Sequence, residues 1–128
     1  MKRLLLDTHV LIWWLADDPR LGAGCRALMA DPRNTVYVSA ATVWEVGIKR
    51  ALDKLDAPEG LADVVNEEGF EALPIGLAHG EYAGALPPLH RDPFDRMLVA
   101  QAQLEGLQLV TADTQLAAYG VSLLSPAI

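Results

Sequence analysis

The segment HRDPFDRMLVAQA, residues 90–102, places two aspartates three positions apart at the start of an apolar, helix-like run. Asp92 directly precedes Pro93, a residue common in the first turn of helices, so Asp92 can cap the helix and Asp95 can complete a capping exchange. Two carboxylates at this spacing can instead bind a divalent metal ion. The segment alone leaves both interpretations open.

Three further acids stand beside apolar segments, where a charged group loses hydration. Asp7 and Asp113 come just after the apolar segments RLLL and LQLV, and Glu45 has apolar neighbours on both sides. Asp7 and Asp113 can cap the helices that follow, and Glu45 can pair with Lys49 four residues later. Together the acids favour a metal site, because carboxylates about 4 Å apart repel by about 4 kcal/mol per pair unless a cation neutralises them. Oxygen ligands select Mg²⁺ or Mn²⁺ rather than structural zinc.

The elements that must position these acids alternate between strands and helices. Hydrophobic patterning predicts strands at 3–7, 35–39, 70–75, 107–111 and 121–124. Helices are predicted at 8–16, 22–31, 40–55, 58–69, 76–86, 93–106 and 113–120. Pro58 is expected in the first turn of the fourth helix. This alternation is typical of one α/β domain, here residues 1–128, with a central parallel sheet flanked by helices. Ligands bind beyond the carboxyl ends of such strands, where Asp7 and Asp113 fall.

Composition narrows the classes of function. The net charge of −7 argues against a general nucleic-acid coat, which needs a basic face, whereas a nuclease needs only local cations beside its metal. The single cysteine, Cys25, indicates a reducing, cytoplasmic setting, and no apolar run is long enough to span a membrane. A nucleotide-binding Rossmann protein is set aside because no glycine-rich loop follows the first strand. An aspartyl phosphatase is set aside because position 9 is His rather than a second Asp.

Four segments resemble the PIN-domain family, and within it the VapC-type toxins of bacterial toxin–antitoxin pairs: residues 4–15, 39–55, 90–102 and 109–113. The resemblance implies a PIN-like sheet of five parallel strands whose first and fourth strands are adjacent. It also implies a metal-dependent endoribonuclease that hydrolyses RNA phosphodiester bonds by a metal-activated water. By position, the catalytic and metal-binding quartet, which would hold Mg²⁺ or Mn²⁺, is Asp7, Glu45, Asp95 and Asp113.

Several neighbours of the quartet are assigned supporting roles. Thr111 is predicted to hydrogen-bond a ligand carboxylate or to satisfy the backbone at the strand end. Lys49 and Arg96 are predicted to contact RNA phosphates, with ion pairs to the nearby acids as the alternative. For His9 and His90, local hydrogen bonding is favoured over substrate contact.

The resemblance further implies two kinds of protein partner. One is a cognate VapB-like antitoxin that covers the acidic pocket, and the other is a second copy of the chain in a homodimer. The adjacent Trp13 and Trp14 fit either a dimer contact or the core. Two alternative functions stay open: a non-catalytic PIN-fold binding or regulatory module, and a nuclease of RNA processing rather than a toxin.

Overall fold

Five parallel strands form the centre of the molecule in the computed structural model, which describes residues 1–128. Their order across the sheet is β3-β2-β1-β4-β5. The strands are β1 (Arg3–Leu6), β2 (Thr35–Ser39), β3 (Glu71–Leu73), β4 (Gln108–Val110) and β5 (Leu123–Leu124). The predicted α/β fold is confirmed, including the adjacency of the first and fourth strands, since Leu6 of β1 is paired with Val110 of β4.

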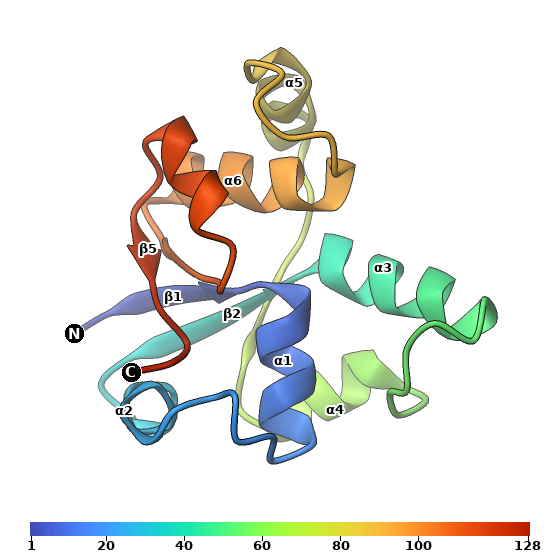
Figure 1. The fold of residues 1–128 in the computed structure, drawn as a ribbon, viewed down its shortest axis with the longest axis vertical. Helices are drawn as coiled ribbons and strands as arrows, with labels where there is room; N and C mark the ends of the chain where they lie inside the picture. Colours follow the sequence, from blue (N-terminus) through green and yellow to red (C-terminus); the bar gives the residue numbers. More distant parts are fainter.

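Helices cover both faces of this sheet, as Figure 1 shows. The α-helices are α1 (Thr8–Leu15), α2 (Ala23–Ala30), α3 (Ala40–Ala51), α4 (Leu61–Glu67), α5 (Leu77–Ala85) and α6 (Pro93–Glu105). A short 3₁₀ helix, η1 (Thr114–Tyr119), joins β4 to β5. No helix combines the length and the apolar character that crossing a membrane requires.

The alternating side chains of β1 divide the core into two halves. Leu4 and Leu6 belong to a cluster with residues of α1, α2 and α4, whereas Leu5 belongs to a cluster with residues of α6 and η1. All three leucines are fully buried, as expected for a central strand covered on both faces. The strand that ends at Asp7 is therefore fixed in place from both sides.

Three predicted helices differ from the observed ones. The helix expected over 40–55 ends at Ala51, because Asp53 adopts a left-handed conformation (φ 53°) and the Lys54 N–H turns back to the Lys49 carbonyl at 2.8 Å. The helix expected from 58 begins at Leu61 after the left-handed Gly60, so Pro58 lies outside it. The segment 113–120 is helical as expected, but it forms a 3₁₀ turn.

Candidate active site

Two acids meet where the adjacent strands β1 and β4 end. Asp7 caps α1, since its Oδ1 accepts the Val10 N–H at 2.9 Å. Asp113 caps η1 in the same way, with Oδ1 accepting the Gln115 N–H at 3.0 Å. The Thr111 hydroxyl links the pair, because it donates to Asp7 Oδ2 at 2.6 Å and accepts the Asp113 N–H at 3.0 Å. Residues more than 100 positions apart in sequence are thereby held side by side, with Thr111 in the supporting place predicted for it.

Glu45 reaches the same place from α3. The side chain is buried, and its two oxygens accept the Thr8 hydroxyl at 2.5 Å and the Lys49 ammonium at 2.6 Å. This hydrogen bond to Glu45 raises the pKa of Lys49. Lys49 therefore remains a cation at the rim of the site, although one that is already engaged by a carboxylate.

The sequence left open whether Asp92 and Asp95 cap a helix or face a metal site, and the two residues differ in this respect. Asp92 is the N-cap of α6, since its Oδ1 accepts the N–H groups of Phe94 at 2.8 Å and of Asp95 at 3.3 Å. Asp95 stands in the first turn, and no protein group donates a hydrogen bond to its carboxylate. Burial, reinforced by the negative charge of Asp92, raises the pKa of Asp95 to about 7. Burial also raises the pKa of Asp7, although the Thr111 hydrogen bond opposes that shift.

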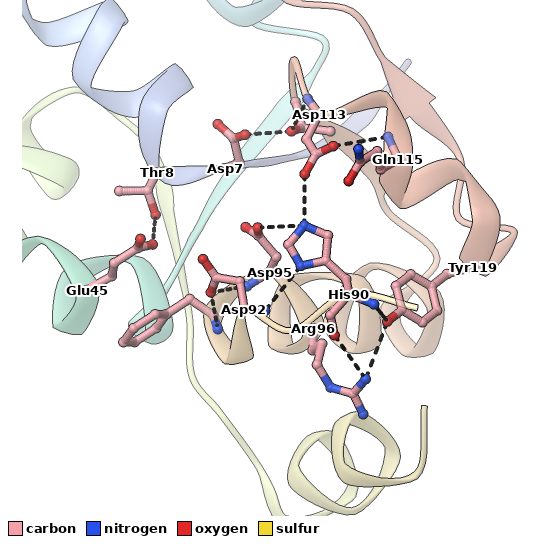
Figure 2. A network of polar contacts seen from close by, with 12 residues as sticks. Asp7, Thr8, Glu45, His90, Asp92, Asp95, Arg96, Asp113, Gln115 and Tyr119 are labelled. Atoms are coloured by element: carbon pink, nitrogen blue, oxygen red, sulfur yellow. Dashed lines mark hydrogen bonds and ion pairs between the residues drawn. The ribbon is translucent and has the colours of Figure 1, made fainter. Parts of the chain in front are cut away.

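His90 occupies the centre of the acid group, as Figure 2 shows. Its Nε2 lies 3.0 Å from Asp113 Oδ2 and 3.6 Å from Asp95 Oδ2. Its Nδ1 accepts the Asp92 N–H at 3.2 Å, so the neutral ring carries its proton on Nε2, facing the two carboxylates. The local hydrogen bond that the sequence favoured for this histidine is present, with the Asp92 N–H, but the sequence did not predict its contacts with Asp113 and Asp95. Its position two residues before a helix cap was the available signal.

The acids line one pocket of about 460 Å³. Its walls are formed by Asp7, Thr8, His9, Trp13, Arg20, Glu45, Lys49, Asp92, Asp95, Ala112 and Asp113. Two of these acids, Asp95 and Asp113, together with the neighbouring His90 offer ligand atoms that lie within 4.8 Å of one another. Carboxylate oxygens are suitable ligands for a hard divalent cation. The residues present therefore fit a metal ion, whose charge would offset the crowding of acids.

Arg96 lies away from the pocket, unlike Lys49. Figure 2 shows its side chain directed away from the acids, toward Tyr119. The guanidinium donates to the carbonyls of Ala83, Leu86 and Pro87 at 2.9 to 3.0 Å. Arg96 therefore ties α6 to the end of α5 and, in contrast to the prediction, is not available as a phosphate contact.

Trp13 and Trp14 take separate places. Trp13 lines the pocket, and Trp14 packs against Phe70 with ring centroids 5.7 Å apart. Both side chains also pack against the core cluster, which is one of the two interpretations that the sequence left open.

Known proteins match this chain along most of its length. The family profile of the PIN domain matches residues 4–121. Ribonuclease VapC22 of Mycobacterium tuberculosis is 31% identical over 124 residues, which cover 91% of each chain. Ribonuclease VapC16 of the same organism is 38% identical over 69 residues, which cover 48% of this chain and about half (49%) of that relative.

Solved structures agree with these sequence matches. A toxin–antitoxin complex from Klebsiella pneumoniae contains a chain that superposes with a TM-score of 0.67 at 25% identity, over 96% of this chain and 97% of that one. VapBC2 from Rickettsia felis, bound to a DNA fragment from its promoter, superposes with a TM-score of 0.71 at 17% identity, over 96% and 98%. On the profile match and the VapC22 alignment, the chain belongs to the PIN domain family.

Proposed function

We propose that this chain, as one PIN domain over residues 1–128, is a metal-dependent endoribonuclease and the toxin of a VapBC-type pair. The observation that carries the proposal is the convergence of Asp7, Glu45, Asp95 and Asp113 in one pocket from four different elements. The ribonuclease names of the two mycobacterial relatives support the choice of RNA as substrate. Because all four acids are present and face one cavity, the alternative of a non-catalytic module has no observation in its favour.

The metal would be held by the carboxylates of Asp7, Asp95 and Asp113, with Glu45 beside them. His90 lies beside these acids, so it would either become a further ligand of the metal or move away when the metal binds. When bound, Mg²⁺ or Mn²⁺ supplies a low-pKa water and stabilises negative charge on phosphate oxygens. The oxygen-rich donor set favours these two ions.

The residues of the chain position the reactants. Thr111 fixes the Asp7 carboxylate, and Thr8 and Lys49 fix Glu45, so these two acids present their oxygens in set directions. In the proposed hydrolysis, the oxygen of water forms a bond to phosphorus while the bond to the 3′-oxygen breaks and that oxygen gains a proton. The products are a 5′-phosphate and a 3′-hydroxyl, and the 2′-hydroxyl takes no part.

The acidic character of the pocket also indicates which partner would bind there. Its five carboxylates would attract a basic segment of a VapB-like antitoxin, which would then compete with metal and RNA. The solved toxin–antitoxin complexes of similar fold support such a partner. We also propose that the chain forms a homodimer and acts in the cytoplasm. The buried free thiol of Cys25 fits such a reducing compartment.

The proposal is tested with purified chain and both structured and single-stranded RNA, in Mg²⁺, Mn²⁺ or EDTA. We expect cleavage with either metal, none in EDTA, and a loss of about 10³-fold in Asp113→Asn. Asp63→Asn is the matched control, because Asp63 is exposed on α4 and lies outside the pocket. Circular dichroism checks the fold of each variant. Cleavage that persists in EDTA and in Asp113→Asn would remove the metal-dependent mechanism.

A further inference from the structure

One wall of the pocket is formed by residues outside the acid quartet. Arg20 and Trp13 both line the pocket, and the guanidinium carbon of Arg20 lies 4.9 Å from the centroid of the Trp13 ring. The ring centroid of His9 lies 6.2 Å from that of the same tryptophan. The wall thus presents a cation braced on an aromatic face, a contact that holds a guanidinium in place.

The pocket offers an RNA strand few cations. Five carboxylates line it, against Lys49 and Arg20 as the permanently charged cations. The Lys49 ammonium already contacts Glu45 at 2.6 Å, and its side chain is 35% exposed. The Arg20 side chain is 68% exposed, and its Nη1 has no hydrogen-bond partner in the protein. With Arg96 engaged by backbone carbonyls, Arg20 is the arginine of this pocket that keeps donors for a phosphate, on the Nη1 that its pairing with Asp18 leaves unbonded.

The turn that presents Arg20 also holds its guanidinium in one place. In the sequence Asp18-Pro19-Arg20, Nε and Nη2 of the arginine donate to the two oxygens of Asp18 at 3.1 and 2.7 Å. One edge of the planar group, formed by Nε and Nη2, is therefore held by Asp18, while Nη1 keeps N–H donors that suit a phosphate oxygen. A preformed donor loses less conformational entropy when it binds.

The chain contains a second turn of the same sequence type at another place. It shows which properties of Arg20 come from the turn and which come from its position beside the pocket. In Asp31-Pro32-Arg33 the same fork forms, with Nε at 3.1 Å and Nη2 at 2.8 Å from the Asp31 oxygens. Arg33 is 84% exposed, has no aromatic ring beneath it and lies outside the pocket. The fork by itself is therefore a local turn feature, and only Arg20 combines it with a place beside the acids.

We propose that Arg20, braced on Trp13, binds an RNA phosphate adjacent to the bond cut in the active site. This inference rests on the proposed ribonuclease function and adds a residue that positions the substrate. Arg20 would replace Arg96 as the arginine that offsets the acidic surroundings of the incoming strand. The role is electrostatic and geometric, so it should affect binding of every RNA sequence in similar measure.

The test compares Arg20→Gln with Arg33→Gln as its matched control. Binding of a short single-stranded RNA is measured over a range of salt concentrations, with Ca²⁺ in place of Mg²⁺ to slow cleavage. We expect Arg20→Gln to weaken binding about tenfold and to reduce the salt slope by about 0.7, the value for one phosphate contact on a single strand. Arg33→Gln should match the unchanged chain. Arg20→Lys should recover the salt slope, because it keeps the charge, but only part of the affinity.

A second measurement locates the contact on the RNA. Neutral methylphosphonates placed at successive positions should weaken binding by the unchanged chain at one position next to the cleaved bond. Arg20→Gln should be insensitive to that replacement, which a merely structural role would not produce. If the unchanged chain binds and cleaves RNA while Arg20→Gln behaves like Arg33→Gln, this inference is wrong and the proposed function stands. If the unchanged chain neither binds nor cleaves RNA, both are wrong.

Discussion

Asp7 and Asp95 face the same pocket, but the protein satisfies their carboxylates in opposite ways. Both oxygens of Asp7 accept hydrogen bonds, from the Val10 N–H at 2.9 Å and from the Thr111 hydroxyl at 2.6 Å. The Asp95 carboxylate accepts none, and the Nε2 of His90 lies 3.6 Å from its Oδ2. Hydrogen bonds from the protein thus offset part of the cost of burying Asp7, whereas the partly buried Asp95 has no such donor.

This difference indicates which part of the site depends most on a ligand. An ionised carboxylate that loses water without gaining donors costs free energy, which is why the pKa of Asp95 rises to about 7. A divalent cation would remove that cost. Asp7 depends less on the cation, because the donors that replace its water are part of the protein itself.

The largest expected effect comes from neutralising each acid in turn. Asp95→Asn and Asp7→Asn should both reduce RNA cleavage by about 10³-fold, as expected for loss of a metal ligand. Their free energies of unfolding should differ. Asp95→Asn should be more stable than the unchanged chain by about 2 to 4 kcal/mol at pH 8 without metal, because it removes a partly buried charge that accepts no hydrogen bond from the protein.

Asp7→Asn should show no comparable gain in stability. Its amide NH₂ would replace an acceptor oxygen and face a donor, a mismatch that costs about 1 to 3 kcal/mol. Urea unfolding of both variants, followed by circular dichroism, measures the difference directly. Equal stabilisation by the two substitutions would mean that the hydrogen bonds to Asp7 do not distinguish it from Asp95.

The next largest effect concerns pH, and its sign follows from the raised pKa of Asp95. In the unfolded chain this carboxyl ionises near its ordinary value of 3.8, whereas in the folded protein it stays protonated up to about pH 7. The folded state therefore binds more protons between these values, and stability falls as pH rises through that window. Relative to Asp95→Asn, the unchanged chain should lose up to about 4 kcal/mol between pH 4 and pH 8.

Metal should oppose this loss. Mg²⁺ or Mn²⁺ binds the ionised carboxylates, so it should raise the melting temperature more at pH 8 than at pH 5, where protons compete for Asp95. Differential scanning calorimetry with and without metal measures both trends, and Asp95→Asn serves as the reference at each pH. A stability difference between the two chains that stays constant with pH would contradict the assignment to Asp95.

The strand-end half of the site could be predicted from sequence because local rules fix it. An acid directly after a buried strand and before a helix both caps that helix and lies at the carboxyl edge of the sheet. Asp7 and Asp113 satisfy both rules, and the parallel pairing of β1 with β4 brings them together. The same capping rules assigned Asp92 to the start of α6.

His90 and Arg96 could not be placed in this way, because their partners come from distant loops. His90 reaches the acids on a loop whose backbone N–H is held by the Tyr119 hydroxyl at 2.9 Å. Arg96 donates to the carbonyls of Ala83 and Leu86 at the end of α5. The last carbonyls of a helix have no hydrogen-bond partner within the helix. A sequence pattern indicates which side chains carry charge, but not which loop will offer them acceptors.

The smallest expected effect belongs to Thr111, the residue that makes Asp7 differ from Asp95. Thr111→Val keeps the shape of the side chain but leaves Asp7 Oδ2 without its donor and the Asp113 N–H without its acceptor. Cleavage should fall about 10- to 100-fold, as for other partners of metal ligands, while Thr111→Ser should retain most of it. Because that hydrogen bond holds down the pKa of Asp7, the valine variant should also lose stability more steeply as pH rises. Asp7 would then behave as a second uncompensated carboxylate like Asp95, and a pH dependence equal to that of the serine variant would contradict the distinction between them.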